Sequence, residues 1–282
     1  MDELLRGFLR SPVALLYAAA LTLSGLLIAA EALVGRATRR PLYGWRDTLA
    51  NGAMFAGYFL INLVWVHAVF AIYSLAYRHA PLRLSVGGWH VGAELWWEWV
   101  VLFLLDDLCF YAFHRSSHTL RLLWASHVNH HSSRRFNLSV AFRQTWTPFF
   151  AVLFWLPLPL LGFDPLMVMT MQALSLFYQS ALHTQLVPSL GPLEWVLNTP
   201  RHHRVHHGSN EQYLNKNMGG VLIVWDRLFG TFAREDEPIR YGLHEDLDGY
   251  NPLRIAFHEW IALARDVRRA PSWRQALARL VG

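Results

Sequence analysis

The sequence predicts an all-α integral membrane protein: a helical bundle of about four to five membrane helices, including a hairpin, with a cytosolic cap of histidine-rich helices. Charged residues make up only 16% of the 282 residues, against about 25% in soluble proteins. Several apolar runs are long enough to cross the roughly 30 Å of bilayer hydrocarbon as helices. Ten of the fifteen histidines fall in a few short segments.

Cysteine content and charge exclude some classes of protein. The single cysteine, Cys109, excludes a disulfide framework and a multi-cysteine metal site. The formal net charge is +5, and a basic protein can bind either nucleic acid or an anionic membrane surface. The apolar runs favour the membrane and predict that no nucleic acid is bound.

Three apolar runs come first. Residues 12–34 are interrupted only by Glu31, and residues 49–77 contain His67 but no charged residue. A cleaved signal peptide is the alternative for the first run. Its apolar core is typically only about 7–15 residues long, which favours a retained helix. The third run, residues 91–113, contains four acids that should face protein, water or a functional site rather than lipid: Glu94, Glu98, Asp106 and Asp107.

A helical hairpin and a basic tail follow. Residues 149–161 contain Pro157 and Pro159, which should kink that arm, and residues 166–187 run back after a turn at 162–165. Residues 254–282 carry arginines among apolar residues, a pattern typical of an amphipathic helix on anionic headgroups; a solvated helix is the alternative. These arginines are Arg265, Arg268, Arg269, Arg274 and Arg279.

Loop arginines predict the orientation in the membrane. Residues 35–47 contain four arginines and residues 114–146 contain five, whereas residues 78–90 contain two. Arginine-rich loops favour the cytoplasmic side. We therefore expect an integral protein of a bacterial inner membrane, with its N-terminus outside and its histidine-rich part facing the cytoplasm.

The histidines occur at helical ligand spacing. Residues three and four apart share a helix face, and neighbours lie about 100° apart, so that adjacent imidazoles can reach two neighbouring metal ions. Nine imidazoles exceed the needs of one ion and predict two. Imidazole suits zinc, copper, iron and nickel. The candidate ligands are His114, His118, His127, His130, His131, His183, His203, His206 and His207.

Three further residues are candidates for supporting roles around the ligands. Asp107 stands seven residues before His114, with Tyr111 between them on the same helical stripe. Its carboxylate is a candidate acceptor for the distal N–H of a ligand, and Asp226 is a weaker candidate for the same role. His202 neighbours a ligand but stands off the repeated spacing.

Alternative functions stay open on the residues alone. A zinc-dependent membrane hydrolase would use three protein ligands and a water, and the segment His258-Glu259 lacks the second histidine of a His-Glu-x-x-His motif. A non-enzymatic membrane haem protein would place histidines on facing membrane helices. A metal-binding or transport protein would place its ligands inside the spans, where only His67 clearly lies.

The combined motifs resemble those of the membrane fatty acid hydroxylase and sterol desaturase superfamily, over roughly residues 95–235. The matching residues are Asp107-(x3)-Tyr111-(x2)-His114-Arg115-(x2)-His118, Leu123-Trp124-(x2)-His127-(x2)-His130-His131-Ser132, His203-Arg204-Val205-His206-His207-Gly208 and Trp225-Asp226-Arg227-Leu228-Phe229-Gly230-Thr231. The segments 182–184 and 199–208 look most like the branch that contains alkylglycerol monooxygenase.

This resemblance implies a membrane oxygenase with two histidine-bound iron ions on the cytosolic side. The eight clustered histidines would be ligands, His183 would match an additional one, and Gln179 stands where some members have a further histidine. Such an enzyme would use O2 and two electrons to hydroxylate or desaturate a lipid entering from the bilayer, such as a sterol, a fatty acyl chain or an ether lipid. The electrons would come from a separate partner, with tetrahydrobiopterin as a candidate donor. The expected domains are N-terminal membrane helices at 1–90, the catalytic domain at 91–235 and the basic helical tail at 236–282.

Overall fold

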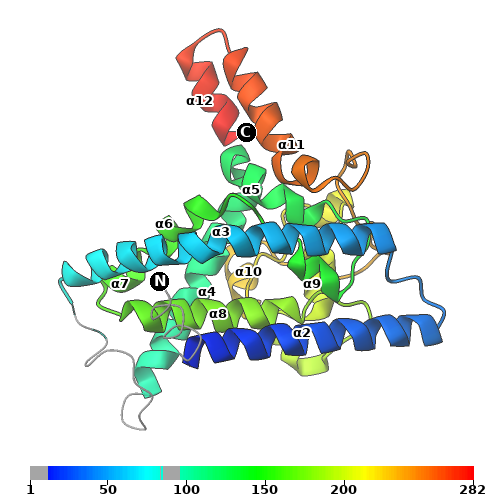
Figure 1. The fold of residues 1–282 in the computed structure, drawn as a ribbon, viewed down its shortest axis with the longest axis horizontal. Helices are drawn as coiled ribbons and strands as arrows, with labels where there is room; N and C mark the ends of the chain where they lie inside the picture. The colour runs from blue at the N-terminus through cyan, green and yellow to red at the C-terminus, as the bar shows by residue number, and fades with distance from the viewer. Residues whose placement is uncertain (1–11, 83, 85–95) are drawn as a thin grey trace.

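The computed structural model describes residues 12–82, 84 and 96–282, and these form helices joined by loops (Figure 1). Their only β-pairing consists of two isolated bridges, so the predicted all-α class is confirmed. The helices are α2 (Pro12–Ala37), α3 (Trp45–Arg78), α4 (Trp96–Thr119), α5 (Arg121–His131), α6 (Ala151–Trp155), α7 (Pro157–Leu160), α8 (Pro165–Ser180), α9 (Pro200–His206), α10 (Val224–Phe229), α11 (Pro252–Arg268) and α12 (Trp273–Val281). Short 3-10 turns lie at η1 (Leu138–Phe142), η2 (Pro148–Phe150), η3 (Gly191–Trp195) and η4 (Glu211–Tyr213).

Two helices are long and apolar enough to cross a membrane, Ala18–Ala37 within α2 and Trp45–Arg78, which is α3. They match the first two predicted runs. Most of their large apolar side chains are exposed rather than buried inside the protein, as expected of helices that face lipid. Each of them packs against α8 (Figure 1). These helices indicate a membrane protein.

The third predicted run and the first histidine pair belong to one continuous helix, α4. The start of that run, residues 91–95 with Glu94, and the expected domain boundary at 90/91 lie outside the described residues. The other three acids of the run, Glu98, Asp106 and Asp107, are at most 1% exposed. The expectation that they avoid lipid is confirmed.

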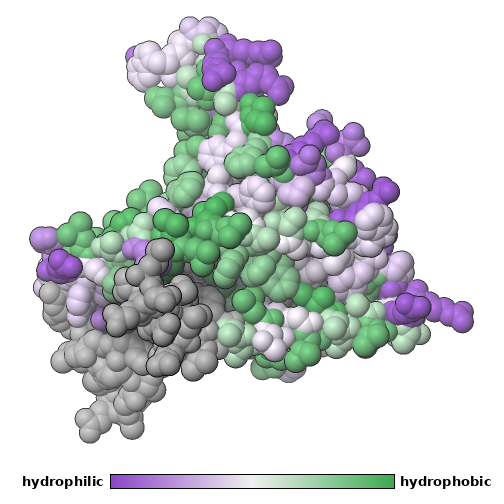
Figure 2. Space-filling model, in the orientation of Figure 1, coloured by the Kyte–Doolittle hydropathy of each residue, from purple (hydrophilic) through white to green (hydrophobic). Residues whose placement is uncertain are grey.

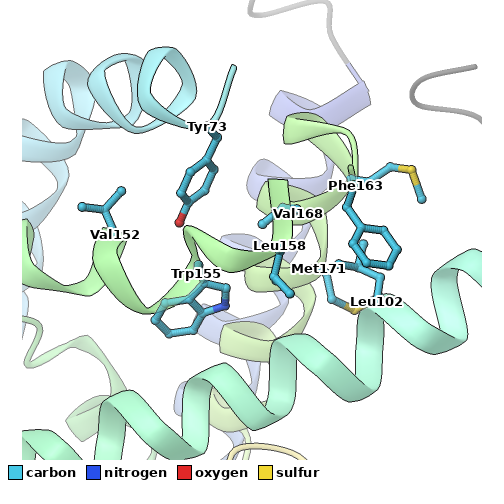
Figure 3. Packing of buried hydrophobic residues seen from close by; sticks show 9 residues of the cluster. Tyr73, Leu102, Val152, Trp155, Leu158, Phe163, Val168 and Met171 are labelled. Carbon is cyan, nitrogen blue, oxygen red and sulfur yellow. The ribbon is translucent and has the colours of Figure 1, made fainter. Parts of the chain in front are cut away.

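The proline-bearing arm of the hairpin is broken into η2, α6 and α7, and α8 runs back after a turn at Gly162, whose φ is +91°. This hairpin packs against α3 and α4 around a core that includes Tyr73, Leu102, Trp155 and Phe163 (Figure 3). The indole N–H of Trp155 donates to Asp106 at 2.7 Å. The core therefore fixes α4, whose far end carries the first histidines.

A buried ion pair ties the segment after α5 to α3. The guanidinium of Arg143, 2% exposed, donates to Asp47 at 2.5 Å. It also donates to Asn51 of α3 at 2.7 Å and to Ser132, directly after α5, at 2.9 Å. A buried charge is stable only when paired and hydrogen-bonded, and here every partner joins α3 to the end of the helix that carries three histidines.

Trp146 adds a close contact with α3. Its indole N–H donates to the carbonyl of Met54 at 2.9 Å. A Cβ at Gly57 would lie 2.2 Å from Cε2 of Trp146, closer than non-bonded atoms approach. Glycine at position 57 is therefore what lets the indole lie against the helix.

We expect Gly57→Ala to lower the melting temperature of the detergent-purified protein, because the added methyl group forces the rigid indole away. Overpacking of this kind typically costs about 1–3 kcal/mol of unfolding free energy. The matched control is Gly52→Ala in the same helix, where a Cβ meets no atom within 4 Å. Equal melting temperatures for the two variants would contradict the contact.

Candidate metal centre

The nine candidate ligands come from four segments and converge in two groups. His114 and His118 lie at the end of α4, three histidines lie on α5, three lie on or just after α9, and His183 follows α8. Within each group the possible ligand nitrogens all lie within 4.8 Å of one another. The first group is His114, His118, His127, His131 and His206; the second is His130, His183, His203 and His207.

Adjacent histidines divide between the two groups, as helical geometry predicts. His130 and His131 go to different groups, and so do His206 and His207. The groups are neighbours, because the rings of His131 and His207 stack with centroids 4.4 Å apart. Two rigid helical segments therefore set the separation of the groups.

The Nε2 atoms within a group approach one another closely. The Nε2 atom of His127 lies 3.0 Å from that of His114 and 3.1 Å from that of His131. In the second group, the corresponding distances from His183 are 3.1 Å to His130 and 3.0 Å to His203. Two ligands at right angles on a metal with bonds of about 2.1 Å would stand about 3.0 Å apart, and tetrahedral ligands about 3.4 Å. The spacing fits a metal with right-angled imidazole ligands.

The protonation state of the imidazoles also fits a metal site. Burial, reinforced by neighbouring imidazoles, holds the pKa of His127, His131, His203 and His206 well below the ordinary value of 6.5. These rings are therefore neutral, with a lone pair free to bind metal. The buried Nε2 atoms of His118 and His206 have no hydrogen-bond partner in the described part of the chain, and a cation would satisfy both.

Backbone carbonyls orient three of the rings. The Nδ1–H of His114 donates to the carbonyl of Met218 at 2.8 Å, and that of His206 to Lys216 at 3.0 Å. His183 donates to the carbonyl of Gln179, one turn earlier, at 3.0 Å. A bond at Nδ1 fixes the tautomer and leaves Nε2 for the metal.

Comparison with known proteins agrees with this arrangement. Residues 99–231 match the family model described as fatty acid hydroxylase. The chain carries a fatty acid hydroxylase domain. All nine candidate ligands lie inside it, and the family resemblance drawn from the motifs is confirmed.

The chain is also similar to curated proteins that are named as lipid oxygenases. The chain is 42% identical over 168 residues to alkylglycerol monooxygenase of Homo sapiens, covering 59% of this chain and 38% of the relative. The corresponding protein of Danio rerio is 46% identical over 162 residues, 57% of this chain and 36% of the relative. Ornithine lipid hydroxylase OlsE of Rhizobium tropici is 32% identical over 137 residues, 48% of this chain and 41% of the relative. The chain thus spans about two fifths of the length of these relatives, and no solved structure matches it.

Asp107 does not form the predicted hydrogen bond with the N–H of a metal ligand. Its carboxylate accepts from the backbone N–H of Val221 at 2.7 Å and of Leu222 at 3.0 Å, and from the indole of Trp225 at 2.9 Å. The assignment to a ligand is therefore corrected. Seven residues separate Asp107 from His114, which is about 10 Å along the helix axis, too far for the carboxylate to reach that ring.

Asp226 holds the loop that orients His114. Its carboxylate accepts from the backbone N–H groups of Met218 and Gly219, both at 2.7 Å, and from the hydroxyl of Thr231 at 2.6 Å. The hydroxyl of Tyr111 lies 2.9 Å from that of Thr231, so the third predicted residue joins the same network. Asp226 thus acts on His114 through the main chain of Met218.

Sequence reasoning missed the loop itself. A Cβ at Gly219 would lie 2.4 Å from the carbonyl of Leu222, and one at Gly220 would lie 2.8 Å from Asp107. The pair Gly219-Gly220 was the one sign in the sequence of such a close approach.

His202 belongs to neither group and lies against Phe232, with ring centroids 5.5 Å apart. The Gln179 side chain donates to Ser175 at 3.0 Å, so Gln179 acts through its carbonyl.

We expect Asp226→Asn to weaken metal binding by about 10–100-fold, the usual cost of losing a group that orients a ligand. The amide cannot accept all three bonds, so the Met218 carbonyl loses its fixed position. Chelator competition on the metal-free protein measures the affinity. The control is Asp164→Asn at the N-cap of α8, where asparagine caps equally well. Unchanged affinity in Asp226→Asn would contradict the role.

Proposed function

We propose that this protein is a membrane-bound di-iron oxygenase that hydroxylates or desaturates a C–H bond of a lipid such as a sterol, a fatty acyl chain or an ether lipid. The observation that carries the proposal is the pair of adjacent, all-imidazole groups inside a fatty acid hydroxylase domain. The names of the relatives support a lipid substrate, since they are an alkylglycerol monooxygenase and an ornithine lipid hydroxylase.

The chain's own residues would hold the two ions, five imidazoles on one and four on the other. Bound iron would supply the redox chemistry that converts an unactivated C–H bond with O2. Hydroxylation consumes one O2, two electrons and two protons per C–H bond, with one oxygen atom kept in the product and the other leaving as water. Desaturation has the same electron input, and both oxygen atoms leave as water.

Other functions fit the site less well. A zinc hydrolase needs three protein ligands and a water, whereas the two groups here offer five and four imidazoles. A haem needs two axial histidines rather than clusters. A transporter would use ligands within its spans, whereas none of the nine lies on α2 or α3 and the two on α4 lie near its C-terminal end.

The electrons would come from a separate partner. The similarity to alkylglycerol monooxygenase makes tetrahydrobiopterin a candidate donor. We further propose the division into membrane helices at 1–90, a catalytic domain at 91–235 and a basic tail at 236–282.

The arginine-rich loops support a bacterial inner-membrane protein with the metal centre facing the cytoplasm and four to five membrane helices, adding α4 and the hairpin to α2 and α3. We expect topology reporters fused after Leu84 and after Gly282 to read opposite compartments, with the one at Gly282 cytoplasmic. An extracytoplasmic reading at Gly282 would reverse the orientation and exclude a cytoplasmic reductant.

Lipid analysis of cells that express the protein tests the activity. We expect lipid species heavier by one oxygen or lighter by two hydrogens, together with purified protein that holds two metal ions per chain. His130→Ala should abolish the new species, because it removes one of the four imidazoles of the second group. The control is His244→Ala, an exposed histidine outside both groups. New lipids that persist in His130→Ala would refute the assignment.

A further inference from the structure

Helices α11 and α12 form a hairpin that projects from the bundle (Figure 1). Helix α11 is anchored on α3 through Ile255 and Ala256, which pack against Ala50 and Met54, and both helices of the hairpin also pack against α5. The two caps of the hairpin helices are well formed: Asn251 accepts from backbone N–H groups at the start of α11, and Ser272 does so at the start of α12. The hairpin is thus a defined structural unit with a large free surface.

Helix α12 leaves an apolar stripe uncovered. Trp273, Leu277 and Val281 stand four residues apart, on one side of the helix. Their exposed fractions are 69%, 53% and 56%. The next apolar positions around the helix, Ala276 and Leu280, are partly buried against the rest of the protein. One edge of the apolar face is therefore used for packing and the other edge is free.

The charges of the hairpin are sorted by side. Its two acids, Glu259 and Asp266, both pair with Arg121 of α5, at 2.8 and 2.7 Å. Five exposed arginines form no ion pair with any described residue: Arg265, Arg268, Arg269, Arg274 and Arg279. Both acids thus pair with α5, and the five unpaired arginines make the exposed surface of the hairpin basic. Figure 2 shows hydrophilic side chains gathered along one side of the hairpin tip and hydrophobic ones beneath it.

The hairpin leaves the bundle near a membrane boundary. Helix α3 has 34 residues, about 51 Å at about 1.5 Å per residue, whereas the hydrocarbon core is about 30 Å thick. With Arg78 at one boundary, the other falls about 20 residues earlier, just beyond the Met54 contact with α11. In Figure 1, α12 lies on the side of α11 that faces the Arg78 end of α3, which is the lipid side.

We propose that the α11–α12 hairpin is a membrane-surface arm, whose α12 stripe inserts into the adjacent leaflet while its arginines bind anionic phospholipid headgroups. An apolar stripe with tryptophan, flanked by arginine, is the pattern of a helix lying in the interface. An acidic protein partner would match the arginines but leave the stripe exposed. Arg274 also lies over the Trp273 ring, 5.5 Å from its centroid, so that an amphipathic pair stands at the start of the stripe.

Depth measurements on the full-length protein in nanodiscs test the arm. In a Cys109→Ala background, a spin label at Leu277→Cys reports on the stripe, and one at Gln275→Cys is the matched control on the opposite side of α12. In nanodiscs containing phosphatidylglycerol, we expect the label at 277 to be at least several-fold less accessible to a water-soluble nickel relaxing agent than the label at 275. Replacing all anionic lipid by phosphatidylcholine should reduce this protection.

Three outcomes would overturn the proposal. Equal nickel accessibility at 277 and 275 would show that the stripe stays in water. Protection that is the same in neutral and anionic nanodiscs would remove the role of the arginines. A short distance between 277 labels on two chains would identify a second copy as the occupant of the stripe. None of these readouts depends on the proposed oxygenase activity.

Discussion

The constraint on which the structure depends is that nine neutral imidazoles, six of them buried and three half-buried, must direct their lone pairs at two points. Two Nε2 lone pairs about 3 Å apart repel one another unless a proton or a metal cation lies between them. Four chain segments must therefore end at the same place and be held there by other bonds. The long helices, the broken hairpin and the irregular loops all contribute to that positioning.

Buried acidic residues hold several of the histidine-bearing segments in place. None of the acidic residues in the described part of the chain belongs to either group of candidate ligands. Glu31, 3% exposed in the apolar helix α2, accepts from the hydroxyl of Thr184, the residue after His183, and from the backbone N–H of Leu138. Asp47 holds the end of α5 through Arg143. Burying a carboxylate in a membrane helix costs free energy. Glu31 offsets this cost with hydrogen bonds that fix the segment carrying His183.

Helical periodicity explains how much of the site the sequence could predict. A spacing of four assigns two histidines to the same group, as in His127 and His131, whereas spacings of one and three divide them between the groups, as His130 shows against both. Periodicity shows which side of the helix a residue faces but not how far apart two residues lie along the axis. For this reason the pairing of Asp107 with His114 was wrong. The carbonyls of Lys216 and Met218 carry no side-chain signal, so the groups that orient His206 and His114 could not be found from residue types.

The fold could be predicted where the length of an apolar run determines a helix. It was harder to predict where contacts between distant residues determine the structure. The apolar runs identified α2 and α3, and the prolines identified the broken arm, because each rests on a local property. The contact between Trp146 and Gly57 joins residues 89 positions apart in the chain and has no local signature.

The shared helices also couple the two metal groups mechanically. Helix α5 and the α9 segment each supply both groups, and the apolar residues between their histidines, Val128 and Val205, are 4% and 0% exposed. A rotation of either helix would move histidines of both groups together, since adjacent side chains are fixed about 100° apart. Packing of these two valines therefore fixes, in both groups at once, the histidines that α5 and the α9 segment supply, whereas His114, His118 and His183 are positioned separately by α4 and α8.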